Sequence, residues 1–96
     1  MITPLAIARH STAIRRLAQR LRAANPRLFG SVLRGGATKE SDIDILVDAL
    51  PGATLFDLGG LQMALEELLG VPVDLLTPQD IQPRLRETVL AEARPI

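Results

Sequence analysis

The positions of hydrophobic and polar residues predict an alternation of short helices and strands. Apolar residues recur on one face of a helix over residues 4–24, with Thr3 as its N-cap and a proline at its first position. Asn25-Pro26 ends this helix, because proline cannot continue it. A short extended run over residues 27–29 follows.

The next segments contain a turn and a clear strand. A short helical turn is expected from Gly30-Ser31 to about Arg34, where a pair of glycines ends it. Residues 41–48 alternate between polar and apolar positions, which is typical of a strand. One face of this strand is apolar and consists of Ile43, Ile45 and Val47.

The C-terminal half repeats the alternation. A leucine-rich helical stripe over residues 55–69 ends at Gly70, and it predicts a core-facing helix or a dimer surface. Residues 71–76 form another strand, and Pro72 within it favours an edge position. A last helix begins at Thr77-Pro78 and continues through residue 89.

Composition limits the class of protein. The 96 residues are 47% hydrophobic and 23% charged, which are ordinary values for one small globular domain spanning residues 1–96. The absence of cysteine excludes disulfides and thiol nucleophiles and leaves oxygen ligands for any metal. No apolar run is long enough to cross a membrane and the N-terminus does not resemble a leader, so a cytoplasmic protein is expected.

The zero net charge conceals an asymmetry. Residues 1–34 contain seven arginines and no acidic residue, whereas residues 35–96 contain eleven acidic and four basic residues. A basic first third suits nucleic acid or an acidic partner, and clustered acids suit cations. Only two aromatic residues occur, both phenylalanine, so base-stacking platforms are not expected and nucleic acid is not the favoured ligand.

Three aspartates are candidates for metal chemistry. Asp42 and Asp44 lie two apart on one strand and therefore project from the same face. On the later strand, Asp74 alternates with apolar residues and therefore lies on the polar face, as Asp42 and Asp44 do on theirs. Carboxylates that converge in this way suit Mg²⁺, which takes oxygen ligands together with substrate phosphate. The alternative is a half-exposed sheet whose outer face is simply acidic.

Gly30-Ser31 is a candidate phosphate-binding corner. It stands where a strand meets a short helix, so that free backbone N–H groups and a hydroxyl are available to phosphate oxygens. Arg34, three residues after Ser31, can add a permanent positive charge. A plain turn with a serine N-cap and a solvated arginine is the alternative.

In combination these motifs resemble a known superfamily. Gly30-Ser31, ten intervening residues, Asp42-Ile43-Asp44 and a later strand with Asp74 resemble the signature of the DNA polymerase β nucleotidyltransferases. Over about residues 28–89 the chain looks like a minimal nucleotidyltransferase (MNT) protein, the antitoxin of HEPN/MNT toxin–antitoxin pairs. The resemblance implies an α/β (α+β) domain with a small mixed β-sheet flanked by helices.

The resemblance also implies an activity. Asp42 and Asp44 would bind Mg²⁺, two ions in all, and Asp74 would complete the catalytic triad. Gly30 and Ser31, with Arg34 as an additional clamp, would contact the triphosphate of ATP. A hydroxyl would attack the α-phosphate and pyrophosphate would leave. Many relatives carry arginine directly after the Gly-Ser pair, whereas this chain has Val32, so one phosphate or partner contact is absent.

The implied partner is a HEPN-domain toxin that receives AMP on a hydroxyl, expected to be tyrosine. Arg9, Arg16, Arg20 and Arg27, treated as one helical group, are candidates to dock this partner, with a solvated face as the alternative. Two other functions remain open: an antitoxin that masks the toxin stoichiometrically without catalysis, and a small nucleic-acid-binding module. Self-association through the leucine-rich helix is a further expectation.

Overall fold

The computed structural model describes residues 3–30 and 43–96 of the chain. In chain order its elements are α1 (Pro4–Ala8), α2 (Ser11–Arg20), β1 (Ala23–Phe29), β2 (Ile43–Ala49), α3 (Leu55–Leu69), β3 (Val73–Leu76), the 3₁₀ turn η2 (Pro78–Asp80), α4 (Pro83–Glu92) and β4 (Arg94–Pro95). The strands form one mixed sheet in the order β3-β2-β1-β4. The α/β class expected from the sequence is therefore confirmed.

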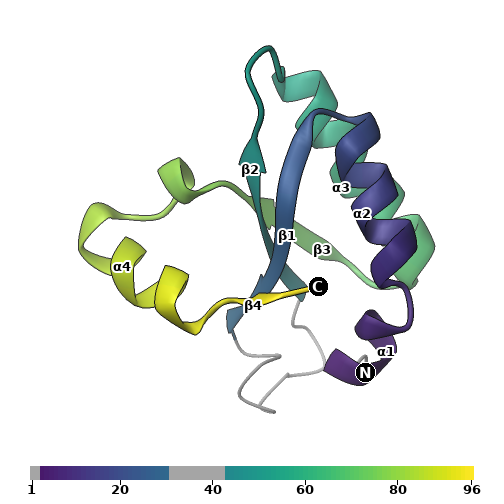
Figure 1. Ribbon diagram of the computed structural model, residues 1–96, viewed down its shortest axis with the longest axis horizontal. Helices are drawn as coiled ribbons and strands as arrows, with labels where there is room; N and C mark the ends of the chain where they lie inside the picture. The colour runs from purple at the N-terminus through teal and green to yellow at the C-terminus, as the bar shows by residue number, and fades with distance from the viewer. Residues whose placement is uncertain (1–2, 31–42) are drawn as a thin grey trace.

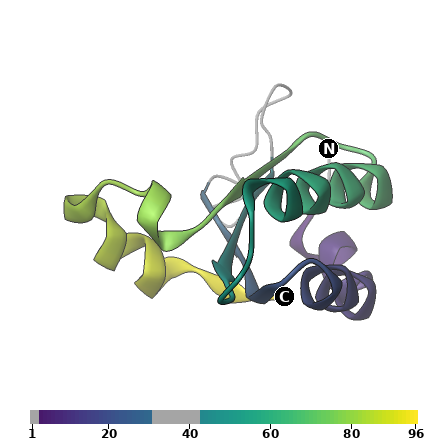
Figure 2. The ribbon, with the colours of Figure 1, turned by 90° about the horizontal axis from the view of Figure 1, so that it is seen from above.

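The sheet has a helical layer on one side and a more open side opposite. β1 pairs antiparallel with β2 and β4, while β2 pairs parallel with β3 through the crossover helix α3. Figures 1 and 2 show α1, α2 and α3 on one face and α4 with η2 on the other. β3 is an edge strand, as Pro72 predicted. Of the described helices, none has the length and hydropathy that crossing a membrane requires.

The core lies between the sheet and the layer of α1, α2 and α3. Ile43, Ile45 and Val47 of β2 are buried against this layer, as the alternation of the sequence predicted. The helices contribute further buried side chains, namely Ile7, Ile14, Ala18, Leu61 and Leu65. Because side chains alternate along a strand, burial of this face directs Asp44 to the other.

The N-terminal helix predicted over residues 4–24 is wrong in its extent. It is divided at residues 9–10 into α1 and α2, and it ends at Arg20. Arg22 adopts a left-handed backbone conformation with a φ of 60°, which terminates the helix in the way that glycine usually does. The Arg22 carbonyl then accepts a hydrogen bond from the Leu50 amide at 2.9 Å, which ties this turn to the end of β2.

Asn25-Pro26, expected to stop the helix, instead lies inside β1. Here the register with β2 shifts, because Ala24 pairs with Asp48 and Arg27 pairs with Leu46. Two residues of β1 thus face one of β2 in a β-bulge, and Asn25 accommodates it with a φ of 54°. The bulge reverses the side-chain parity along β1, which explains why Ala23 and Leu28 are both buried in the same core.

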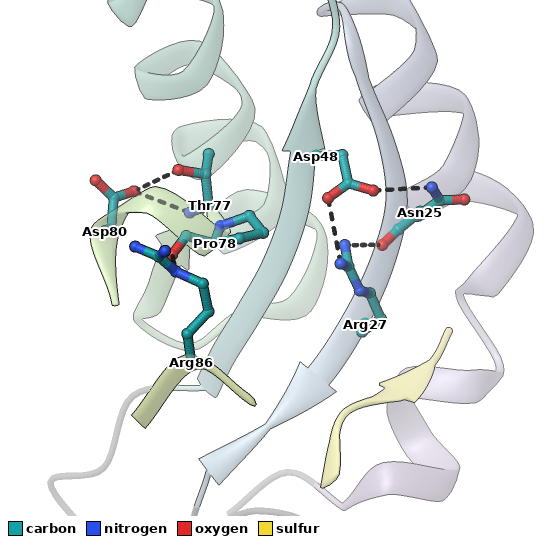
Figure 3. Close-up of polar contacts among 7 residues, drawn as sticks. All are labelled: Asn25, Arg27, Asp48, Thr77, Pro78, Asp80 and Arg86. Atoms are coloured by element: carbon teal, nitrogen blue, oxygen red, sulfur yellow. Dashed lines mark hydrogen bonds and ion pairs between the residues drawn. The ribbon is translucent and has the colours of Figure 1, made fainter. Parts of the chain in front are cut away.

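The last helix also begins later than predicted. Thr77-Pro78 opens η2, where the Asp80 carboxylate accepts hydrogen bonds from the Thr77 amide and hydroxyl, and α4 starts only at Pro83. The Arg86 side chain links α4 to this turn by donating a hydrogen bond to the Pro78 carbonyl at 2.7 Å (Figure 3). It donates a second hydrogen bond to the Ile81 carbonyl at 3.1 Å. Every residue of α4 is exposed or half-buried, so the helix projects from the body (Figure 1).

Replacing the central core residue tests this architecture. Ile45→Ala removes a fully buried side chain from the middle of β2 and should lower the free energy of unfolding by about 2–5 kcal/mol. Leu5→Ala, at a position that is 66% exposed, should change it by less than about 0.5 kcal/mol. Urea denaturation followed by circular dichroism measures both, and equal losses would contradict the placement of the core.

Candidate active site on the open face of the sheet

Two carboxylates stand side by side at one end of the sheet. In the parallel pairing of β2 with β3, Asp44 is the register partner of Asp74, between the pairs Ile43–Val73 and Ile45–Leu75. Residues paired in this way project from the same face of a sheet, with their strands about 4.8 Å apart. The parity that the sequence predicted for Asp74 is therefore observed, although Asp44 and Asp74 are separated by thirty positions.

Gly30 closes this site from the end of β1. It follows Phe29, whose register partner is Asp44, and it adopts a φ of +82°, which L side chains rarely accept. A Cβ placed on Gly30 would overlap the Asp44 carboxylate oxygen Oδ2 and would lie 3.2 Å from Cγ. The backbone at Gly30 and the Asp44 carboxylate thus pack directly together, which is possible because glycine has no side chain.

The other predicted site residues lie outside the described part of the chain. These are Ser31, Arg34 and Asp42. Within residues 3–30 and 43–96, no group of three or more histidine, cysteine or acidic side chains is placed to hold a metal ion. The structure therefore brings together Gly30, Asp44 and Asp74, and the roles of all six residues stay predictions.

A second polar cluster lies further along the same face and was missed in the sequence. Asp48 accepts a hydrogen bond from the Asn25 side-chain amide at 2.9 Å and pairs with the Arg27 guanidinium at 3.2 Å (Figure 3). Arg27 is thus a residue of β1, as the extended run predicted over residues 27–29 requires, and only its grouping with the helical arginines is wrong. In the sequence, Asp48 is an even number of positions after Asp44, which placed it on the same face of the strand, but nothing there indicated its partners.

The cluster is distinct from the carboxylate pair. Asp48 lies four positions after Asp44 on β2, which corresponds to about 13 Å along the strand. An open hollow of about 660 Å³ lies at this distant end, between α2, β1 and the C-terminal segment, with Leu50, Leu90 and Pro95 in its walls. Gly30, Asp44 and Asp74 do not line it, so this hollow is separate from the candidate active site.

Comparison with known proteins agrees with the geometry. The family model described as "Nucleotidyltransferase domain" matches residues 9–96. The chain belongs to the nucleotidyltransferase family. A relative from Methanocaldococcus jannaschii, assigned by name to the protein adenylyltransferases, is 47% identical over 66 residues, which cover 69% of this chain and 71% of the relative.

Solved structures share the nucleotidyltransferase fold. A structure described as a minimal nucleotidyltransferase is 43% identical, with a TM-score of 0.87 over 99% of this chain and 97% of that one. A toxin–antitoxin crystal structure with AMP-PNP is 25% identical, with a TM-score of 0.70 over 88% of this chain and 70% of that one.

A third structure shares the fold at 22% identity, with a TM-score of 0.66 over 92% of this chain and 69% of that one. Its subject is a tri-AMPylated HEPN toxin of Shewanella oneidensis in complex with an MNT antitoxin. The mixed sheet and helices of this nucleotidyltransferase are thus the fold that the sequence resemblance implied.

Substitution of Gly30 tests the contact that builds the site. Gly30→Ala should cost about 1–2 kcal/mol of backbone strain and should also displace the Asp44 carboxylate, so that nucleotidyl transfer is lost. Gly70→Ala is the matched control, because Gly70 has a φ of +72° and no described atom lies within 4 Å of a Cβ built on it. Thermal unfolding and a transfer assay measure the two effects, and equal activity of the two variants would contradict the contact.

Proposed function

We propose that the chain transfers AMP from ATP to a hydroxyl, that of a tyrosine, on a HEPN-domain toxin and thereby neutralises it. The observation that carries the proposal is the register pairing of Asp44 with Asp74 beside the glycine corner at Gly30. The name of the M. jannaschii relative and the AMP-PNP bound to a similar toxin–antitoxin structure support protein adenylylation with an adenine nucleotide.

The reaction is a substitution at the α-phosphorus of ATP. A bond forms between the acceptor oxygen and the α-phosphorus, the bond from that phosphorus to the bridging oxygen breaks, and pyrophosphate leaves with the electron pair. Asp74 orients the acceptor hydroxyl and accepts its proton at a carboxylate oxygen, because its side chain is the more exposed of the described pair. Asp44, packed against Gly30, would hold the Mg²⁺ whose positive charge receives the phosphate oxygens.

The donor set of the site fits Mg²⁺. Asp44 and Asp74 provide carboxylate oxygens on one face, and Asp42 precedes Asp44 by two positions in the sequence. Magnesium prefers one or two carboxylates together with phosphate oxygens. When bound, Mg²⁺ supplies positive charge that stabilises the phosphoryl oxygens during transfer. Ser31, Arg34 and the backbone at Gly30 are proposed to hold the phosphates.

The acceptor belongs to another molecule. The 96 residues contain no tyrosine, so a tyrosine acceptor has to come from a partner. α4 lies on the side of the sheet opposite the layer of α2 and α3 (Figure 2). Asp44 and Asp74 project to this side as well, because the neighbouring Ile43, Ile45 and Val73 are buried on the other. A toxin that approaches this open side reaches the carboxylates without crossing the helical layer. The use of ATP favours a cytoplasmic reaction.

Asparagine substitution tests the roles of the carboxylates. Asp44→Asn and Asp74→Asn should each lower the rate of AMP transfer to the toxin by about 10²–10⁴-fold, because each removes an anionic oxygen without changing the size of the side chain. ATP labelled at the α-phosphate should leave label on the toxin, and ATP labelled at the γ-phosphate should not.

Asp48→Asn is the matched control. It changes an aspartate on the strand and face of Asp44 that lies about 13 Å from it and pairs with Arg27. This variant should keep most of the transfer activity. If neutralisation of the toxin survives Asp42→Asn and Asp44→Asn together, stoichiometric masking replaces catalysis. If Asp44→Asn and Asp74→Asn keep AMP transfer while Asp48→Asn loses it, the site is misplaced.

Removal of the metal is a further test. Chelation of divalent cations should abolish labelling of the toxin from α-labelled ATP, and addition of Mg²⁺ should restore it, because the carboxylates and phosphates otherwise repel one another. The same chelation should leave the circular dichroism spectrum unchanged, since the core consists of apolar contacts. Transfer at full rate without divalent cations would contradict the assignment.

A further inference from the structure

β3 lies at the edge of the sheet, and its main chain carries hydrogen-bonding groups that β2 does not use. The Ile43 amide donates a hydrogen bond to the Pro72 carbonyl at 3.0 Å. In a parallel pair, the main-chain groups of alternate residues point toward the partner strand, so the main chain of Asp74 bonds with β2. The amides that point away from β2, toward the free edge of the sheet, are those of Val73, Leu75 and Thr77.

Side-chain carboxylates accept hydrogen bonds from the amides at both ends of this row. The Val73 amide donates to Glu66 Oε2 at 2.9 Å. The Thr77 amide donates to Asp80 Oδ2 at 2.8 Å. The amide between them is that of Leu75, and none of the described residues accepts a hydrogen bond from it. Edge strands are commonly protected against further pairing, so one open amide between two protected ones marks a place for a partner strand.

This open amide is adjacent to the candidate active site. Leu75 directly follows Asp74, which is the more exposed of the two described carboxylates. Across the sheet, the site extends from Gly30 at the end of β1, through Asp44 on β2, to Asp74 on β3. A second substrate that arrives at the free edge of β3 therefore reaches Asp74 without crossing β1 or β2.

The proposed transfer, on which this inference rests, gives the direction from which the acceptor approaches. In an in-line displacement, the attacking and leaving oxygens lie on opposite sides of the phosphorus. With the triphosphate at the Gly30 corner, pyrophosphate leaves toward β1 and the acceptor hydroxyl enters over β3. We propose that the toxin carries its acceptor tyrosine on an extended segment, which pairs with the free edge of β3 through the Leu75 amide.

Strand pairing places the tyrosine hydroxyl where the reaction needs it. A segment paired with β3 continues the sheet, and its side chains alternate between the two faces. Every second residue then stands on the open face, where a tyrosine spans the strand spacing of about 4.8 Å and reaches the Asp74 carboxylate. The hydrogen bonds of Glu66 and Asp80 limit the pairing to a few residues, so the edge accepts one short segment.

Proline at position 75 tests the hydrogen bond from the edge. Leu75→Pro removes the amide hydrogen that points away from β2 and keeps the ladder with β2, since edge strands accept proline. Leu75→Ala is the matched control, because it shortens the same side chain and keeps the amide. Relative to Leu75→Ala, Leu75→Pro should raise the KM for the toxin by about tenfold, because a toxin carbonyl loses its donor.

The KM for ATP should be the same in both variants, because the nucleotide lies over β1 and β2. Transfer of label from α-labelled ATP to the toxin measures both constants, and circular dichroism checks that each variant is folded. Equal KM values of the two variants for the toxin would overturn the proposal.

Amide hydrogen exchange of the unsubstituted chain gives a second test, which holds even if Leu75→Pro does not fold. The complex contains the chain labelled with nitrogen-15, the toxin and a non-hydrolysable ATP analogue. Exchange of the Leu75 amide should slow by about tenfold or more when the toxin binds. The amides of Val73 and Thr77 already have carboxylate partners and should slow much less. Unchanged exchange at Leu75, or equal slowing at all three amides, would overturn the proposal.

Failure of this inference is distinguishable from failure of the proposed function. If the parent chain transfers no label from α-labelled ATP to the toxin, the proposed function is wrong. If it transfers label while both tests at Leu75 are negative, the function stands and the pairing at β3 is wrong. Slowed exchange at Leu75 without any transfer would support pairing of the toxin with this edge and overturn the transfer.

Discussion

The parallel pairing of β2 with β3 is the constraint on which the candidate site depends. It brings Asp44 and Asp74 together from distant parts of the sequence and fixes them on one face of the sheet. The register is maintained from the opposite face, where Ile43, Ile45 and Val73 are buried. A slip of one residue would send apolar side chains into solvent and carboxylates into the core, which is energetically prohibitive. The hydrophobic core thus positions the polar site.

Gly30 extends this constraint from the strand pair to the end of β1. Its left-handed backbone conformation and its contact with the Asp44 carboxylate each exclude a side chain. The two strands that meet here are antiparallel, so the corner after β1 lies beside the beginning of β2. Glycine at this position consequently permits both a positive φ and a close approach to Asp44, and the site lies where β1, β2 and β3 are side by side.

The two sides of the sheet differ in what they leave uncovered. On the helical side, α2 and α3 complete a core, and the outer face of α3 remains apolar. On the open side, α4 projects from the body and is connected to η2 by the hydrogen bonds of Arg86. The polar cluster of Arg27 and Asp48 lies on this open side too, about 13 Å along β2 from Asp44. Such a division separates the side of the sheet that builds the core from the side that holds the carboxylates.

The sequence alone determined the features that local pattern controls. The alternation over residues 43–47 specified the apolar face of β2 and the opposite face with Asp44, although Leu46 on that second face is also fully buried. The leucine spacing with Thr54 and Gly70 at its ends specified α3. Its motifs also indicated the nucleotidyltransferase family, because the spacing of glycine, serine and aspartates resembles the signature of that superfamily. These signals lie within a few residues of one another or in a fixed order along the chain.

Only the tertiary structure decided the rest. The break between α1 and α2 and the left-handed Arg22 carry no glycine that would have marked them. Asn25-Pro26 suits the end of a helix as well as a β-bulge, and only the pairing of β1 with β2 decides for the bulge. The short strand β4 exists only because β1 offers it an edge. Packing likewise decides which face of α3 stays exposed. It also decides that Asp48 pairs with Arg27 and that Asp44 lies beside Asp74. Contacts between distant residues are set by the burial of the whole chain, and a local pattern does not contain that information.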